Sequence, residues 1–178
     1  MKRHCTLVVT LIALLLVPAL AGAQVRKETV EGIRNFSRLD TTIACAGATT
    51  PSAVADVKKM GYASIINLRM ASEAGADVDA EAAAARSAGI TYVHLPFDTS
   101  KPDPAIIDGF IRAVTTPANQ PAFVHCASGN RAAALWMIKR IDVDGWDTDR
   151  ASAEATALGL TSDALKTFAL NYAQEHKQ

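Results

Sequence analysis

Apolar runs alternate with amphipathic stretches along most of this chain. Four short runs rich in β-branched and aliphatic residues predict buried strands, at residues 41–45, 63–68, 90–95 and 121–124. Stretches with apolar residues at helical spacing predict helices between and after them, at 51–60, 77–88, about 104–115 and about 130–141. Two further helices are expected, because Asp147 and Ser162 or Asp163 stand where N-cap residues stand.

This order of elements predicts an α/β fold. Strand and helix alternate about four times, which favours a central, mainly parallel sheet of four to five strands with helices on both faces. Residues 35–39 are expected to add a short edge strand, and the polar residues 24–34 are expected to be loose. Ligands of such folds bind at the carboxyl ends of the strands. Cys126 and the loops that follow Leu68 and Leu95 should therefore meet at one rim.

The first 23 residues have the pattern of a secretory signal. Basic residues at positions 2 and 3 precede an apolar run over 7–20, and Ala21-Gly22-Ala23 is a small-x-small cleavage site. The apolar run is short for a membrane span, which needs about 20 residues. We therefore expect a signal peptide over 1–23, a single domain over 24–178, a periplasmic or secreted location, and no stable membrane association after cleavage.

Charge and histidine spacing narrow the classes of partner. The 178-residue chain has 18 basic and 18 acidic side chains, a formal net charge of zero, which gives no sign of a nucleic-acid partner. His94, His125 and His176 follow the predicted signal and show no spacing typical of metal ligands. We expect neither a metal ion nor another cofactor.

The candidate site is the run His125-Cys126-Ala127-Ser128-Gly129-Asn130-Arg131, between a predicted strand and a predicted helix. The first N–H groups of a helix lack partners within it and carry a partial positive charge. Such a turn can bind an oxyanion, and the same field should favour the thiolate of Cys126 over its thiol. The guanidinium of Arg131 could grip two oxygens of a tetrahedral anion. The pattern favours nucleophilic attack by sulfur on phosphorus or on another sulfur.

Within this run the roles are distributed as follows. Cys126 is the candidate nucleophile and Arg131 the group that orients the anion. The backbone N–H groups of 127–131 complete the binding loop. Ser128 could instead be an ordinary loop hydroxyl, and Asn130 is equally suited to cap the helix. His125 is expected to lie beneath the loop, hydrogen-bonded to backbone, where it holds Cys126 in place.

The run resembles the signature of cysteine-dependent phosphatases, in which a His-Cys pair opens a phosphate-binding loop that arginine closes. It departs from that signature in two ways. Four residues separate Cys126 from Arg131 where the superfamily usually has five, and Ala132 stands where Ser or Thr usually helps the leaving thiolate. Four residues are also the loop length of rhodanese sulfurtransferases, so the loop alone leaves phosphoryl and sulfur chemistry open.

A wider pattern is similar to the bacterial phosphatase-like family related to the N-terminal domain of beta-lactamase-hydrolase-like proteins. It covers roughly residues 30–172, and its shared segments are Ala46-Gly47, Thr50-Pro51, 59–62, 65–69, Glu73, Gly89-Ile90, Tyr92, Leu95-Pro96, 125–131 and Leu135-Trp136. The resemblance implies a dual-specificity-phosphatase-like fold. It also implies metal-independent hydrolysis of a phosphomonoester through a phosphocysteine. The substrate would be phosphotyrosine, another phosphoprotein or a small phosphorylated molecule.

The same resemblance implies a general acid in the loop after the third buried strand. Asp98 is the first choice there and Asp103 the alternative, although Asp103 is also suited to cap the next helix. Arg69 is expected either to line the pocket or to pair with Glu73. Trp136, Met137 and His94 are expected in the core.

Two other functions stay open on the sequence. One is a rhodanese-like sulfurtransferase that carries a persulfide on Cys126, although the Gly-His-Ile run usual upstream of a rhodanese loop is absent. The other is a non-catalytic oxyanion-binding module, which the hydroxyl-free Ala132 favours. A structural disulfide between Cys45 and Cys126 is disfavoured because it would disable the loop.

Overall fold

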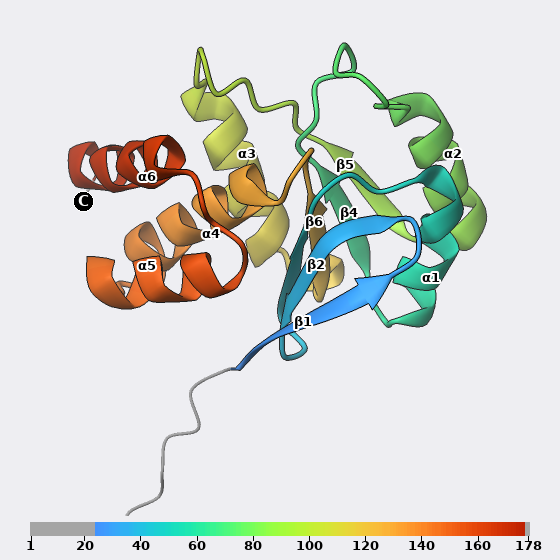
Figure 1. The fold of residues 1–178 in the computed structure, drawn as a ribbon, viewed down its shortest axis with the longest axis horizontal. Helices are drawn as coiled ribbons and strands as arrows, with labels where there is room; N and C mark the ends of the chain where they lie inside the picture. The colour runs from blue at the N-terminus through green and yellow to red at the C-terminus, as the bar shows by residue number, and fades with distance from the viewer. Residues whose placement is uncertain (1–23, 177–178) are drawn as a thin grey trace, which may run out of the picture.

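The computed structural model describes residues 24–176, which form one sheet covered by helices (Figure 1). The strands are β1 (Val25–Val30), β2 (Ile33–Leu39), β3 (Ile43–Ala46), β4 (Ser64–Asn67), β5 (Thr91–His94) and β6 (Ala122–His125). The α-helices are α1 (Val54–Lys59), α2 (Val78–Ala88), α3 (Pro104–Thr115), α4 (Asn130–Asp142), α5 (Thr148–Ala157) and α6 (Asp163–Glu175). The predicted signal peptide, residues 1–23, lies outside the described residues.

The sheet has six strands in the order β1-β2-β3-β6-β4-β5. The pairs β3–β6, β6–β4 and β4–β5 are parallel, whereas β1–β2 and β2–β3 are antiparallel. The predicted α/β class and the mainly parallel core are confirmed. The last strand in the chain, β6, lies between β3 and β4, and it ends where the candidate site begins.

The N-terminal hairpin is the main departure from the sequence prediction. Residues 24–34 were expected to be loose, yet they form β1 and the start of β2, so β1 is the edge strand and β2 is not. The four central residues of β1 are exposed, so the strand lacks the apolar alternation that would have revealed it. A turn at Glu31-Gly32, with Gly32 at φ 74°, joins the two strands.

The two faces of the sheet carry different helices, and β6 divides its side chains between them. Phe123 packs in the cluster beneath α1 and α2, whereas Val124 and Cys126 pack in the larger cluster beneath the C-terminal helices. Figure 1 shows α1 and α2 on one side of the sheet and α3 to α6 on the other. Trp136 and Met137 are buried, as predicted for core residues.

Local capping fixes where the later helices begin. Asp103, Asp147 and Ser162 each accept a hydrogen bond from a backbone N–H in the first turn of α3, α5 and α6, respectively.

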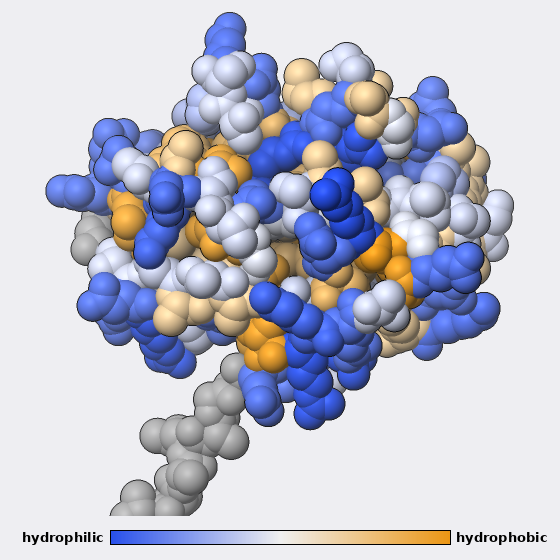
Figure 2. Space-filling view, viewed as in Figure 1, coloured by the Kyte–Doolittle hydropathy of each residue, from blue (hydrophilic) through white to orange (hydrophobic). Residues whose placement is uncertain are grey.

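On the face drawn in Figure 2, hydrophilic side chains surround small hydrophobic patches. Across residues 24–176, no helix combines the length and apolarity that a membrane crossing requires.

Candidate active site

Three loops meet at the carboxyl end of the parallel strands, as the sequence predicts. The N–H of Leu68, after β4, donates to the carbonyl of His125 at 2.9 Å, and the N–H of Phe97, after β5, donates to the carbonyl of Leu68 at 3.1 Å. The first bond continues the β4–β6 pairing by one residue, and the second joins the loop after β5 to the residue that follows β4. They bring the loops after β4 and β5 against the start of the 126–131 loop.

The loop turns at Gly129, which precedes α4 with φ 97°, a left-handed conformation that glycine adopts without a Cβ clash. Its N–H donates to the sulfur of Cys126 at 3.1 Å, the kind of contact that stabilises a thiolate. The N–H of Cys126 itself donates to the carbonyl of Ala46. A cavity of about 380 Å³ opens over this turn, and Ala127, Ser128, Asn130 and Arg131 form one of its walls. Cys126 lies beneath this wall with no exposed surface.

Arg131 crosses the site and is held by the loop after β4 and the loop after β5. Its Nη1 donates to the carbonyls of Leu68 and Phe97, at 3.0 and 3.1 Å, and its two terminal nitrogens bind both carboxylate oxygens of Glu73, at 2.6 and 2.8 Å. Burial opposes the charge of this guanidinium, but Glu73 and Cys126 hold the pKa of Arg131 above its usual value. The guanidinium is thus fixed beside the cavity by a bidentate ion pair.

Glu73 joins two arginines. Besides Arg131, its carboxylate accepts from Arg69 Nε at 3.2 Å and from the N–H of Met70 at 2.9 Å. Burial would raise the pKa of Glu73, but the hydrogen bonds from Arg131, Met70 and Arg69 lower it to about 2. Arg69 was expected either to line the pocket or to pair with Glu73, and the structure shows the ion pair. The terminal nitrogens of Arg69 donate to the carbonyls of residues 74 and 75. The four-residue spacing of Arg69 and Glu73 was the only sequence sign of this pair.

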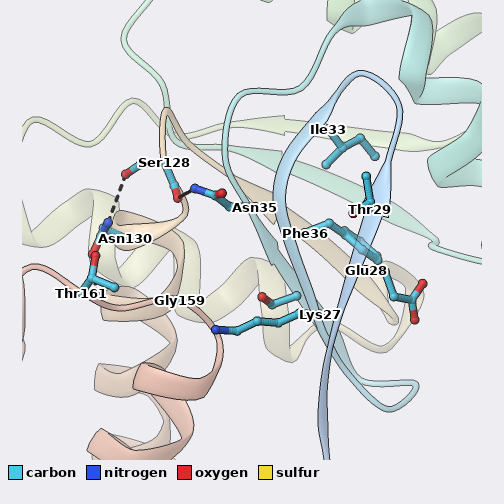
Figure 3. A pocket seen from close by; sticks show the side chains of 11 residues that line it. Lys27, Glu28, Thr29, Ile33, Asn35, Phe36, Ser128, Asn130, Gly159 and Thr161 are labelled. Carbon is cyan, nitrogen blue, oxygen red and sulfur yellow. Dashed lines mark hydrogen bonds between the residues drawn. The ribbon is translucent and has the colours of Figure 1, made fainter.

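Asn130 is the first residue of α4 and does not cap it, because Gly129 occupies the cap position. Its side-chain oxygen instead accepts from the N–H groups of Thr161 and Ser162, at 2.7 and 2.8 Å, and its Nδ2 donates to Ser128 Oγ. Asn35 of β2 donates to the carbonyl of Ser128 at 3.0 Å. Figure 3 shows Asn35, Ser128, Asn130 and Thr161 beside a second hollow of about 420 Å³. The hairpin and the α5–α6 connection therefore both support the loop.

Of the two candidate acids, Asp98 lines the cavity over the loop and Asp103 does not. Asp98 accepts hydrogen bonds from the hydroxyl and the N–H of Ser100, at 2.7 and 2.8 Å, and these bonds lower the pKa of Asp98. Asp103 caps α3 through the N–H of Ala105. Donation of a proton by Asp98 near neutral pH would require its release from Ser100.

His125 points to the opposite face of the sheet from Cys126, toward Glu81 of α2. Its Nε2 lies 2.9 Å from Glu81 Oε1, and neither atom forms a hydrogen bond within the described residues. Within the described residues neither ring nitrogen has a hydrogen-bond partner, so the expected bond to backbone is not found. The other oxygen, Oε2, accepts from Asn67 Nδ2 at 2.7 Å and from the hydroxyl of Tyr92 at 3.0 Å. Burial and the Glu81 charge raise the pKa of Tyr92.

The cysteines and histidines of the described region bear on the remaining predictions. Cys45 and Cys126 are both free and buried, and burial raises the pKa of Cys45. His94, expected in the core, is half-buried and bonds the carbonyl of Arg69 through Nε2. Residues 24–176 contain no cluster of three or more His, Cys, Asp or Glu side chains that could hold a metal ion.

Residues 35–142 match the model of the family described as "Beta-lactamase hydrolase-like protein, phosphatase-like domain". A beta-lactamase hydrolase-like protein of Xylella fastidiosa is 35% identical over 109 residues. That match covers 60% of this chain and only 25% of the relative. The relative therefore has most of its length outside the region it shares with this chain.

Solved structures show the same fold at lower identity. A DUF442 protein from Shewanella putrefaciens is 21% identical with a TM-score of 0.67, over 82% of this chain and 95% of that one. TpbA of P. aeruginosa is 21% identical with a TM-score of 0.63, over 89% and 92% of the two chains. A variant of TpbA in complex with pTyr aligns with a TM-score of 0.58 at 20% identity, over 87% and 99%. With the family match over 35–142, the chain belongs to the family of the phosphatase-like domain of beta-lactamase hydrolase-like proteins.

Proposed function

We propose that this chain is a metal-independent cysteine phosphatase that hydrolyses a phosphomonoester through a phosphocysteine on Cys126. The observation that carries the proposal is the contact between Cys126 Sγ and the N–H of Gly129 at the start of α4, next to a cavity that Arg131 lines. A helix start favours both the thiolate and a bound phosphate dianion. Arg131 would bind the phosphoryl oxygens and offset charge in the transition state.

The reaction would proceed in two displacements. The thiolate of Cys126 attacks phosphorus, the S–P bond forms, and the bond from phosphorus to the ester oxygen breaks. Asp98 gives its proton to the departing oxygen and, as a carboxylate, then takes a proton from a water molecule that attacks phosphorus. Inorganic phosphate leaves and the thiolate is restored. Phosphotyrosine is the substrate class we propose, because TpbA, which has this fold, is described in complex with pTyr.

This mechanism places one demand on the site. Cys126 has no exposed surface, so a substrate must displace part of the wall formed by the 127–131 loop before sulfur can attack. The Glu73–Arg131 pair and the Ser100–Asp98 contact are the neighbouring interactions that would rearrange. Alkylation of Cys126 by iodoacetate measures this opening directly.

A second candidate is a non-catalytic oxyanion-binding module. It is favoured by the same burial of Cys126, by the missing hydroxyl at Ala132 and by the hydrogen bonds from Ser100 that lower the pKa of Asp98. Such a module would protect Cys126 from alkylation when phosphate is added but would not turn over an aryl phosphate. A rhodanese-like sulfurtransferase would instead convert thiosulfate and cyanide.

One set of assays separates these functions. The purified protein is given an aryl phosphate with a chelator present and, separately, thiosulfate with cyanide. The phosphatase predicts chelator-resistant hydrolysis that Cys126→Ser abolishes, and Asp98→Asn should flatten one limb of the pH profile. Activity with thiosulfate alone would contradict the proposal. So would a protein that hydrolyses no aryl phosphate while added phosphate protects Cys126 from alkylation. Tyr92→Phe, which leaves the loop residues in place, is the control variant.

We also propose that the mature protein is periplasmic or secreted, on the signal-like pattern of residues 1–23. Expression of the full chain with N-terminal sequencing of the product tests this. A mature product that starts near residue 24 supports export. An intact N-terminus in the cytoplasmic fraction contradicts it.

A further inference from the structure

Two consecutive carbonyls of the loop after Cys126 are bound by the N-terminal part of the chain. The carbonyl of Ala127 accepts from the N–H of Ala48 at 3.1 Å, and the carbonyl of Ser128 accepts from Asn35 Nδ2 at 3.0 Å. Figure 3 shows the side chain of Asn35 reaching from β2 to Ser128. Of these two donors, only that of Asn35 belongs to a side chain, so a substitution can remove it.

The direction of the Ser128 carbonyl determines where the next N–H points, because the C=O and N–H of one trans peptide group lie in a plane and point in opposite directions. With this carbonyl turned toward Asn35, the N–H of Gly129 is turned to the other side. There it donates to Cys126 Sγ at 3.1 Å. A peptide group that precedes a glycine meets little steric resistance to reversal, because glycine adopts positive and negative φ about equally well. The orientation found here, with Gly129 at φ 97°, therefore depends on the hydrogen bonds that hold its two ends.

Asn35 is aimed at the loop by an irregularity in the hairpin. The β1–β2 register shifts near residue 29, so that residues 34 and 35 of β2 together lie opposite this one residue. Such a bulge redirects side chains and is common next to active sites. Asn35 also has φ 49°, a left-handed conformation that asparagine tolerates better than most residues other than glycine. Together the bulge and this φ place the amide of Asn35 against the carbonyl of Ser128.

The same part of β2 is joined to the other donor, Ala48. Arg34 donates its N–H to the carbonyl of Ala48 at 3.0 Å and accepts from the N–H of Gly47 at 2.6 Å. The fit is close, because a Cβ at Gly47 would lie 3.0 Å from the carbonyl oxygen of Arg34 and 3.2 Å from that of Ala127. Residues 34–35 and 47–48 therefore form one brace behind the loop, bound to two of its successive peptide groups.

We propose that Asn35 is a positioning residue for the loop, whose amide holds the Ser128–Gly129 peptide with its N–H toward Cys126. With this peptide reversed, the carbonyl of Ser128 would face the sulfur, and its partial negative charge would repel both a thiolate and a phosphate dianion, which loops bind through N–H groups. A residue that only fastened the hairpin to the rest of the protein would leave the N–H of Gly129 where it is. The kinetic part of the test rests on the proposed phosphatase function, and the other parts do not.

Two substitutions separate the hydrogen bond from the backbone conformation. Asn35→Gly accepts φ 49° and removes the amide, whereas Asn35→Asp keeps the shape of the side chain and replaces its donor with an acceptor. With an aryl phosphate, kcat/KM should fall about fivefold in Asn35→Gly, the factor that one ordinary hydrogen bond supplies, and further in Asn35→Asp. The inhibition constant of inorganic phosphate should rise in the same order.

Asp40→Gly is the matched control, because Asp40 follows β2 directly and has a similar backbone conformation, φ 43°. It should change neither kcat/KM nor the inhibition constant of phosphate. A loss confined to Asn35→Asp would show an effect of the added charge alone and would overturn the proposal. Equal losses in Asp40→Gly and Asn35→Gly would overturn it as well, because they would reflect the hairpin and not the contact with Ser128.

The N–H of Gly129 reports the orientation of the peptide directly. In protein labelled with nitrogen-15 glycine, its signal is assigned by its absence from Gly129→Ala. In Asn35→Gly this signal should move, and its exchange with solvent should speed up about fivefold, because the bond to Cys126 Sγ is then less populated. In Asp40→Gly the signal should stay unchanged. A change at Gly47 in Asn35→Gly, with Gly129 unmoved, would overturn the proposal.

A measurement on the unaltered protein covers the case in which Asn35→Gly does not fold. The side-chain amide protons of Asn35 should exchange with solvent more slowly than those of Asn171, an exposed asparagine of α6. Equal exchange rates would show that the bond to Ser128 is not maintained, which would overturn the proposal. A wild-type protein without phosphatase turnover would contradict the proposed function, whereas the amide signals of Gly129 and Asn35 would still decide the role of Asn35.

Discussion

Replacing Glu73 with glutamine should destabilise the protein in a manner that depends on pH. Burial would raise the pKa of Glu73, but Arg131, the N–H of Met70 and Arg69 lower it from 4.5 to about 2 in the folded protein. At 1.36 kcal/mol per unit this shift corresponds to about 3.4 kcal/mol. The carboxylate is 24% exposed, so solvent screening reduces the expected contribution to about 1–2 kcal/mol.

The sign follows from the direction of the shift. A carboxyl whose pKa is lowered by folding stabilises the protein above its unfolded pKa, and this stability is lost as pH falls through 4.5 toward about 2. Urea unfolding of wild type and Glu73→Gln should thus differ by about 1–2 kcal/mol at pH 7, and more than roughly half of that difference should disappear by pH 3. Other carboxyls titrate alike in both proteins and cancel. Asp56→Asn, which removes an exposed pair with Lys59, is the control. An equal difference at both pH values would refute the reasoning.

Three further outcomes are expected. Asn130→Ala should lower the free energy of unfolding, measured in urea, by about 1–3 kcal/mol, because the N–H groups of Thr161 and Ser162 lose their acceptor. Asn130→Asp keeps an acceptor oxygen for these two N–H groups and should retain most of the stability. Gly129→Ala should lower the free energy of unfolding by about 1–2 kcal/mol and change the rate of Cys126 alkylation, because φ 97° strains any residue with a Cβ. Gly75→Ala, at φ 72° in another loop, should leave the alkylation rate unchanged. Glu28→Gln should lower the free energy of unfolding by less than about 1 kcal/mol, because its ion pair with Arg38 is partly exposed. A larger loss would show that this ion pair stabilises the hairpin more than its exposure implies.

Features with a local signal could be predicted from the sequence. The apolar runs gave the parallel strands because strands buried on both faces are apolar throughout, and caps such as Asp147 and Ser162 marked helix starts. The convergence of Cys126, Arg69 and Asp98 on one rim followed from the general topology of parallel sheets. Each of these inferences needed only neighbouring residues or a rule that holds for the whole fold class.

Features that depend on distant partners could not be predicted. β1 is stabilised by pairing with β2 rather than by burial, so its polar sequence looks like a loop. Glu81 lies two residues from the exposed acid Asp79 of α2, and its burial against His125 depends on a strand far along the chain. Glu73 was visible as a partner of Arg69, but its bidentate contact with Arg131 required the two loops to be placed in space.

The position of β6 has a consequence for synthesis of the chain. Both neighbours of this strand, β3 and β4, leave the ribosome before it, and neither can pair with the other because β6 must lie between them. Until β6 is in place, β3 and β4 therefore each have an open hydrogen-bonding edge toward the position that β6 occupies. Open edges are templates for pairing with other chains. We expect the nascent protein to require chaperone protection during this interval, and the nucleophile to be assembled only in the last stage of folding.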